Sequence, residues 1–341
     1  MNSIFKICAV LALSLTAFAQ STKVASLIQQ GQSALDDGDL RHAVAAFREA
    51  RELAPDSLEA NRGLVLTYLQ AGDLRDAAQV GTQALGRWPD DAQLQHWVGL
   101  VHFKAENNKL AQELLEKSVK TDGRHFDIHF DLALVMLAQD EYASAATELE
   151  QAIKLDGSKS LAHVLLGRAY QNTNRTLQAI EQFQTALHLD PKTPLGHYHL
   201  GFAYASLGRA SEAISEYEKE LKLGTVNPQV YFRLGHCQLE TGDLNSAVAN
   251  LQKALELDGN NSDAAYDLGK ALLLNGDAAS ASASFQKAIS LKPEDPSPHY
   301  QLARALERLG KKDDARQEFQ RFAELKKAQP DTGGMATGRV Q

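Results

Sequence analysis

The residues best suited to chemistry in this chain are its 11 histidines, and their spacing decides what they could do. Four of them recur at multiples of 34 residues: His129, His163, His197 and His299. Helices in successive layers lie on the order of 10 Å apart, whereas a metal ion needs its ligands at about 2.1 Å. His125 and His129 have better spacing, but no third ligand accompanies them. We therefore expect packing and hydrogen bonding from these histidines, with no metal and no cofactor.

Motifs for covalent or phosphate chemistry are missing from the sequence. It contains no G-x-S-x-G, no H-E-x-x-H and no glycine-rich phosphate loop. The triplet DTG at 331–333 matches that of aspartic proteases, but such chemistry needs a paired carboxylate in a β-rich core. Cys237 is the only cysteine beyond residue 8, and we expect it to be a buried apolar residue. The sequence therefore predicts no enzyme.

The elements that position these side chains are revealed by an internal repeat. Alanine recurs every 34 residues, at Ala43, Ala77, Ala111, Ala145, Ala179, Ala213, Ala247, Ala281 and Ala315. The register defines nine units without insertion or deletion: 24–57, 58–91, 92–125, 126–159, 160–193, 194–227, 228–261, 262–295 and 296–329. Below, residues are also given by their position, from 1 to 34, within a unit.

Each unit encodes a helix, a tight turn, a second helix and a stop. Apolar residues at positions 4, 7, 8 and 11 lie on one face of the first helix. Position 15 is glycine in six units, with Glu106, Asp140 and Asn174 in the other three. Position 8 is mostly glycine and position 20 is always alanine, so two helix backbones can approach closely there. Such a pair cannot bury its own faces, and we expect each pair to pack on the next.

This pattern resembles the tetratricopeptide repeat family, whose signature is a 34-residue helix–turn–helix. The resemblance rests on Leu-Gly at positions 7 and 8, alanine at 20, a bulky residue at 24, a small residue at 27 and proline at 32. The fifth unit shows it well, in LLGRAYQNTNRTLQAIEQFQTALHLDP. The resemblance implies an all-α fold, a right-handed superhelical solenoid of nine repeats. Two departures, Gly81 at position 24 and Glu220 at position 27, predict looser packing.

One face of the first helices is the candidate binding surface. Positions 2, 5, 9, 12 and 13 cluster away from the packing face, and we call them the groove face. In the resembling family this side lines a concave groove that holds extended peptides or partner helices. Two readings of these aromatic residues stay open: they pack sideways onto neighbouring first helices, or they contact a ligand. The candidate residues are Phe130, Arg168, Tyr198, Phe202, Phe232, His236, Tyr266, Lys270, Tyr300 and Arg304.

Position 5 is aromatic mainly from the fourth unit onward, which predicts that the ligand binds in the C-terminal half of the groove. Arg168, Lys270 and Arg304 lie beside these aromatic residues and favour an acidic or C-terminal segment as the ligand. Members of the family that hold chaperone C-termini use lysine at position 5 and asparagine at position 9 in adjacent units, and no unit here has either residue. A cytosolic chaperone adaptor is therefore not expected.

The N-terminal segment predicts export. Residues 1–19 contain Lys6, an apolar run over 7–17 and an A-x-A step at Ala17 and Ala19, which is the layout of a signal peptide. Such a run is too short to span a bilayer, so no membrane span is expected after cleavage. Residues 20–23 form a short lead before the repeats, and 330–341 form a tail that we expect to be flexible. The expected location is periplasmic or secreted, in a bacterium.

Charge and repeat architecture together bound the function. The formal charge is −8, so there is no broad basic field and nucleic acid is not an expected partner. The last unit is basic, which fits either a solvated terminal cap or a patch for an acidic partner. The sequence favours a non-catalytic scaffold that binds peptide segments or partner proteins. The alternative is a structural assembly subunit that self-associates through terminal repeats or the convex face.

Overall fold

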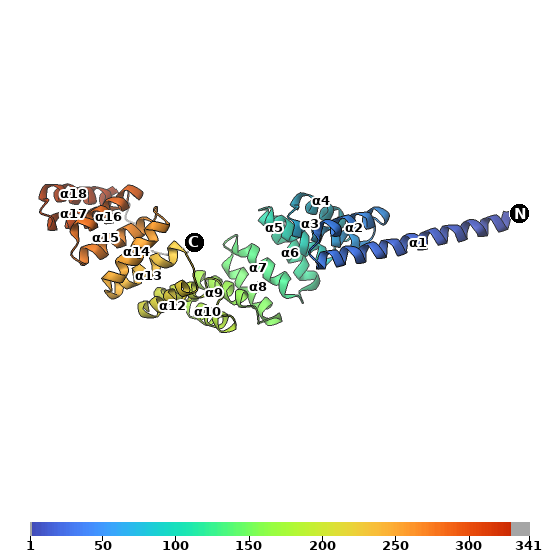
Figure 1. Ribbon diagram of the computed structural model, residues 1–341, viewed down its shortest axis with the longest axis horizontal. Helices are drawn as coiled ribbons and strands as arrows, with labels where there is room; N and C mark the ends of the chain where they lie inside the picture. Colours follow the sequence, from blue (N-terminus) through green and yellow to red (C-terminus); the bar gives the residue numbers. More distant parts are fainter. Residues whose placement is uncertain (1, 329–341) are drawn as a thin grey trace. The chain divides into compact units, whose positions relative to one another are not determined.

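The computed structural model describes the backbone of residues 2–328 and the side chains of residues 19–328. Within this range every regular element is an α-helix, and the 18 helices follow one another as nine packed pairs (Figure 1). The all-α repeat architecture is confirmed. The chain divides into two compact units, 1–157 and 158–341, which we call the N-terminal and C-terminal units. The tail at 330–341 lies outside the described residues.

The N-terminal unit contains four helical pairs. Each first helix packs on the second helix of its own pair, and each pair packs on the next. The helices are α1 (Asn2–Asp36), α2 (Leu40–Leu53), α3 (Leu58–Ala71), α4 (Leu74–Arg87), α5 (Ala92–Lys104), α6 (Asn108–Asp122), α7 (Phe126–Leu137) and α8 (Tyr142–Leu155).

Helix α1 runs without interruption through the expected cleavage point after Ala19, and the side chains of residues 1–18 lie outside the described residues. Among the described residues, no helix combines the length and the hydropathy needed to cross a bilayer.

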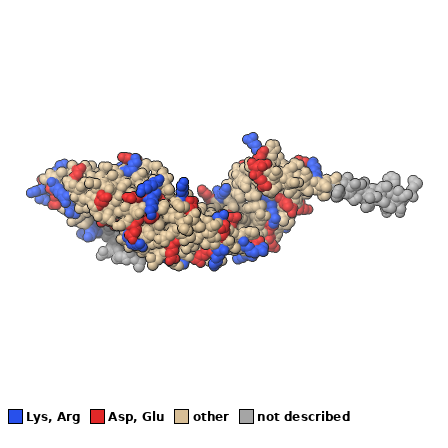
Figure 2. Space-filling model, turned by 60° about the horizontal axis from the view of Figure 1, so that its bottom comes forward, with Lys and Arg blue, Asp and Glu red and all other residues tan. Residues whose placement is uncertain are grey.

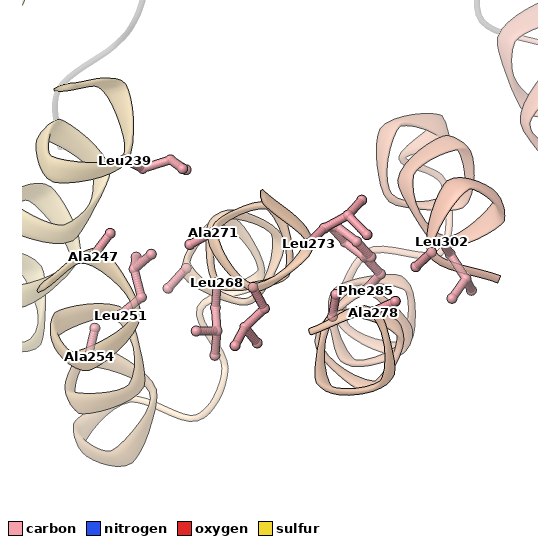
Figure 3. Packing of buried hydrophobic residues seen from close by; sticks show 14 of the residues in the cluster. Leu239, Ala247, Leu251, Ala254, Leu268, Ala271, Leu273, Ala278, Phe285 and Leu302 are labelled. Atoms are coloured by element: carbon pink, nitrogen blue, oxygen red, sulfur yellow. The ribbon is translucent and has the colours of Figure 1, made fainter. Parts of the chain in front are cut away.

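The C-terminal unit contains five helical pairs with the same pattern of packing within and between pairs. The helices are α9 (Ser160–Asn172), α10 (Thr176–Leu189), α11 (Gly196–Ser206), α12 (Ala210–Lys222), α13 (Pro228–Thr241), α14 (Leu244–Leu257), α15 (Ser262–Leu274), α16 (Ala278–Leu291), α17 (Pro296–Arg308) and α18 (Lys312–Ala328). Figure 3 shows part of its core, where Leu251, Leu268 and Phe285 point into the spaces between successive helices.

The turn inside every repeat uses left-handed backbone geometry. The six glycines at position 15 have positive φ, as at Gly72 with φ 78°. The three residues that replace glycine there adopt the same geometry: Glu106, Asp140 and Asn174 have φ of 60°, 59° and 60°. The repeat therefore imposes the turn even where the side chain disfavours it, since left-handed geometry costs L-residues about 1–2 kcal/mol.

The small residues of the repeat make room for large aromatic rings, which pack against them. All nine alanines at position 20 are at most 2% exposed. The ring of Phe47 lies against Gly31 of its own repeat and Gly63 of the next, and a Cβ added to Gly31 would approach the ring to 2.8 Å. Phe183 lies against Gly167 in the same way and stacks on His199 of the next repeat. The expected close approach of the helices is confirmed.

The expectation of loose packing at Gly81 is wrong. A Cβ added there would overlap the side chain of Val98 from the next repeat, so no gap exists. The same repeat has Val65 at position 8 in place of the usual glycine, and Val65 is fully buried. The large and small residues have exchanged places within this repeat.

The expectation at Glu220 is also wrong, because its carboxylate is buried and hydrogen-bonded. Glu220 accepts hydrogen bonds from the backbone N–H of Tyr198 (3.2 Å) and from Oγ1 of Thr225 (2.8 Å). Helix α11 begins at Gly196, after Leu195 in left-handed geometry with φ 58°, and no side chain of Leu195 can cap it. Glu220 supplies the acceptor that this helix start lacks.

Candidate binding surfaces

The aromatic residues of the groove face pack mainly on the second helix of their own repeat. The ring centroids of Tyr198 and Tyr217 are 6.0 Å apart, and those of Tyr300 and Phe319 are 5.7 Å apart. Tyr266 packs on position 24 in the same way. Phe232 is 8% exposed and belongs to the core, whereas Tyr300 is 40% exposed. Of the position 5 residues predicted as anchors, Tyr300 presents the most surface.

One of the three predicted cations, Lys270, and one arginine that was not predicted, Arg233, lie over aromatic rings of the C-terminal unit. The guanidinium of Arg233 lies 4.8 Å from the ring centroid of Phe202 and 5.5 Å from that of Phe232. Lys270 lies 5.5 Å from the ring centroid of Tyr266. Cations over aromatic faces are attracted by the ring quadrupole. These lysine and arginine side chains therefore cover the aromatic residues that were expected to hold a ligand.

The remaining predicted site residues differ in exposure and partners. Arg168 and Arg304 are exposed, and Arg304 donates to Oε1 of Gln301 at 3.3 Å. His236 lies 2.7 Å from Oδ2 of Asp267, and this hydrogen bond raises the pKa of His236. In the N-terminal unit, Phe130 is half-buried and stacks on Phe126.

The position 4 histidines join the two helices of their own repeats. Nδ1 of each lies within hydrogen-bonding distance of the side chain at position 23, as in His129–Glu148 (2.6 Å) and His197–Glu216 (2.6 Å). His163–Gln182 and His299–Glu318 repeat the contact. The expected hydrogen-bonding role is confirmed. No group of three or more potential metal ligands occurs within the part of the chain that the structure describes.

Cys237 is buried, as expected, at 1% exposure. Burial raises the pKa of its thiol to about 11, so the thiol stays protonated at neutral pH.

A cavity of about 450 Å³ lies on the groove face of the N-terminal unit, where the sequence did not predict an adhesive surface. It is formed by α3, α5, the end of α6 and the start of α7. Arg62 and His96 line it from position 5, and Trp97 lines it from position 6. Asp122, His125 and Asp127 complete its charged wall.

Most charged groups of this cavity have partners. Nε of Arg62 donates to Oδ1 of Asp91 at 3.0 Å, and Nη2 pairs with the second carboxylate oxygen. Nε2 of His96 lies 2.7 Å from Oδ2 of Asp131. These pairs fix the two position 5 side chains at the rim.

Asp122 and Asp127 differ in how freely their carboxylates can accept a ligand. Asp122 accepts from Nε of Arg124 at 2.8 Å, and this hydrogen bond lowers its pKa to about 2. Among the described residues, Asp127 has no side-chain partner. Its exposed carboxylate is therefore the uncompensated charge of the cavity wall.

A second cavity of about 300 Å³ in the same unit is lined by Arg51, Asn61, Gln83 and Arg87. Its arginines are engaged: Arg51 donates to Asn61 (2.9 Å) and Gln83 (2.6 Å). Arg87 donates to the carbonyl oxygen of Pro55 at 2.8 Å and pairs with Asp56. Both arginines that line this cavity are therefore occupied by hydrogen bonds within the protein.

Charge is divided unequally between the two units. Residues 20–157 carry 13 Lys and Arg against 22 Asp and Glu, a formal charge of −9, whereas residues 158–328 carry 20 of each. On the visible face, acidic and basic side chains are interspersed (Figure 2). The net acidity of the molecule thus belongs to the unit that contains both cavities.

Some residues in the sequence indicate this cavity, but a comparison of the aromatic residues at position 5 of successive repeats overlooks them. Arg62 and His96 interrupt the row of aromatic residues and therefore looked like its weak end. Trp97 at position 6 and Asp127 at position 2 are the residues that mark the cavity. Counting charge over each half of the chain would also have pointed to the N-terminal unit.

Models of known families match most of the repeat region. A tetratricopeptide repeat model matches 28–92 and 99–160, and two further models of the same repeat match 173–208 and 196–223. A model of the anaphase-promoting complex, cyclosome, subunit 3, matches 240–322. Among curated proteins, no significant match is found.

Solved structures share the fold at low identity. A TPR repeat-containing protein from Cytophaga hutchinsonii is 20% identical, with a TM-score of 0.56 over 68% of this chain and 95% of the other. Cut9–Hcn1 of the APC/C is 18% identical, with a TM-score of 0.55 over 78% and 52%. PilW, described as a type IV pilus biogenesis factor, is 22% identical, with a TM-score of 0.51 over 58% and 92%. By repeat sequence and by fold, the chain belongs to the tetratricopeptide repeat family.

Proposed function

We propose that this protein is a non-catalytic scaffold that binds peptide segments or partner proteins on the groove face of its repeats. The observation that carries the proposal is the 450 Å³ cavity on that face, lined by an indole and by charged side chains. The packing residues of the repeats are already used in the core, whereas Trp97 is half-buried and Asp127 is exposed. Aromatic anchors with nearby charges are the usual basis of such recognition.

Related proteins support this proposal by their described roles. YrrB, 21% identical with a TM-score of 0.50 over 55% of this chain and 95% of the other, is described as a TPR protein with an unusual peptide-binding site. PilW is described as a widely conserved type IV pilus biogenesis factor.

The proposed location is the cell envelope or the secreted space of a bacterium. Its support is the layout of residues 1–19, with the A-x-A step before Gln20. N-terminal sequencing of the protein from its host should find Gln20 or a close neighbour at the start. A soluble cytosolic protein that keeps Met1 would contradict this location.

Cross-linking and pull-down with the chain from residue 20 onward, against envelope extract, tests the scaffold. We expect a defined partner protein, retained by the folded chain and recovered without turnover. A chain with several groove-face residues replaced is the control, and it should release the partner. Retention that is unaffected by those replacements would contradict binding on this face.

A second candidate function is a structural subunit that self-associates. The observation in its favour is a row of exposed leucines at position 30, near the ends of second helices: Leu189 (41%), Leu223 (42%) and Leu257 (39%). Light scattering on the purified chain separates the two functions. An oligomer that dissociates when these leucines become serine supports the subunit, and a stable monomer supports the scaffold.

A further inference from the structure

The cavity of the N-terminal unit has the features of a site for a positively charged group. Its free carboxylate is Asp127, in the first turn of α7, and its aromatic wall is Trp97 from α5. Among the described residues, Asp131 pairs only with His96, and it adds a further acidic group next to this lining residue. A guanidinium can stack on an indole while its N–H groups donate to a carboxylate.

The cavity's own cations do not neutralise this arrangement. Arg62 is held by both carboxylate oxygens of Asp91, and Arg124 is held by Asp122. With histidine counted as neutral, each of these pairs has no net charge, and Asp127 and Asp131 remain. Within the described part of the chain, no lysine or arginine lies over the Trp97 ring. The aromatic face of this cavity is therefore available.

The contrast with the C-terminal unit strengthens the assignment. There, Arg233 covers Phe202 and Lys270 covers Tyr266, so the chain's own cations occupy those aromatic faces. In the N-terminal unit Trp97 lines a cavity of about 450 Å³, and the unit carries a formal charge of −9. A basic ligand is drawn to this unit, whereas an acidic ligand is repelled by it.

We propose that the Trp97–Asp127 cavity binds an arginine side chain from a basic segment of a partner polypeptide. This inference rests on the proposed scaffold function and names the chemistry of its partner. It replaces the acidic or C-terminal ligand that the sequence favoured, because Lys270, one of the three cations expected to hold such a ligand, lies over the ring of Tyr266, and because the N-terminal unit is acidic.

Titration calorimetry with two synthetic peptides tests the site on the full chain. One is an N-acetylated, C-amidated peptide of alternating glycine and arginine, and the other has glutamate in place of arginine. We expect the arginine peptide to bind and the glutamate peptide not to bind. Raising the salt concentration should weaken binding without abolishing it, because the stacking contact on Trp97 is less sensitive to salt than the contact between charges.

Two variants and one matched control locate the binding. Asp127→Asn removes the free charge, and Trp97→Leu removes the aromatic face. Each substitution should lower the affinity for the arginine peptide about fivefold. The control is Glu113→Gln, an exposed acidic residue of α6 that does not line the cavity. It should change the affinity less than twofold. Circular dichroism checks that Trp97→Leu, whose side chain also packs on the core, remains folded.

Each other outcome overturns the inference. Equal weakening by Asp127→Asn and Glu113→Gln would mean diffuse attraction to an acidic unit and no site. Binding of the glutamate peptide, or no binding of the arginine peptide, would do the same. If the pull-down retains a partner and neither cavity variant changes that retention, the scaffold function is supported but the partner does not bind at the cavity. Failure to recover any partner would count against the scaffold itself.

Discussion

The two units of this protein are built from the same repeat but differ in how the aromatic residues on or beside the groove face are used. In the C-terminal unit rings at position 5 pack on second helices, and some groove-face rings also lie beneath a cation of the same chain, as Tyr266 does beneath Lys270. In the N-terminal unit Trp97 lines a cavity beside the uncompensated carboxylate of Asp127. The difference teaches that a row of aromatic residues does not by itself mark a binding site. What matters is whether the protein satisfies those faces internally.

The shared framework should give equal effects in both units, which sets the baseline for the comparison. Phe47→Ala and Phe183→Ala each remove a ring seated on a glycine, and each should lower the free energy of unfolding by about 3–5 kcal/mol. Because each repeat is supported mainly by its neighbours, the loss should be confined to the unit that carries the change. Chemical denaturation followed by hydrogen exchange measures both effects. If only one of the two substitutions lowered the free energy of unfolding, the packing of the rings on glycine would not be equivalent in the two units.

Within the C-terminal unit, the next prediction separates packing residues from surface residues. Phe232→Ser should lower the free energy of unfolding by about 2–4 kcal/mol, because the ring is 8% exposed and packs in the core. Tyr300→Ser, at 40% exposure, should cost about 1 kcal/mol or less. Thermal melting compares the two variants. Equal losses would show that the exposed ring of Tyr300 is as firmly packed as that of Phe232, and that no position 5 aromatic of this unit is available to a ligand.

A pH effect should also distinguish the units, since the C-terminal unit contains His199, whose half-buried ring packs between repeats. Its ring stacks on Phe183 at a centroid distance of 5.6 Å, and burial, followed by the nearby charge of Arg168, lowers its pKa to about 3. The unfolded chain, with a histidine pKa of about 6.5, then binds a proton that the folded chain does not. Stability should fall as the pH drops below about 6.5, by about 2 kcal/mol at pH 5.

His199→Phe should keep the stacking and remove this loss, while exposed His188→Gln serves as the control. His236 has the opposite sign: its raised pKa adds stability at low pH that is lost as the pH rises through the folded value. An unchanged pH profile in His199→Phe would show that other groups set the acid sensitivity.

The smallest expected effect concerns the turns. Glu106→Gly should raise the stability of the N-terminal unit by about 0.5–1 kcal/mol, because glycine adopts φ of 60° without the strain that Glu106 bears. Gly208→Ala in the C-terminal unit should lower stability by about 1 kcal/mol, because φ of 71° disfavours any residue with a Cβ. Denaturant midpoints measure both. If Glu106→Gly lowered stability and Gly208→Ala raised it, these turns would not have left-handed backbone geometry.

The repeat itself was predictable because its rules are local. The alanines at position 20, the glycine turn and the helical periodicity each follow from one residue type at a fixed spacing, and the structure confirms them. The exchange of Val65 and Gly81 was not predicted, since it needs two positions to be considered together. Glu220 was misjudged because its role is to cap a helix that starts late at Gly196, which the repeat pattern does not reveal.

The binding surface was less predictable than the fold. Exposure at position 5 depends on what the second helix places beneath it, which is why Phe232 is buried and Tyr300 is not. The engagement of Arg233 with Phe202 depends on side-chain reach between repeats. The cavity beside Trp97 arises from residues of four helices, α3, α5, α6 and α7, and of the loop between α6 and α7. None of these relations follows from one position of the repeat.

Amide hydrogen exchange of the full chain, with and without the alternating glycine–arginine peptide, tests the central claim most directly. If the Trp97–Asp127 cavity binds a basic segment, slowed exchange should be confined to α3, α5 and the start of α7, and Asp127→Asn should reduce it. Slowed exchange in α11, α13, α15 or α17 instead would return the binding surface to the aromatic residues of the C-terminal unit and contradict this account.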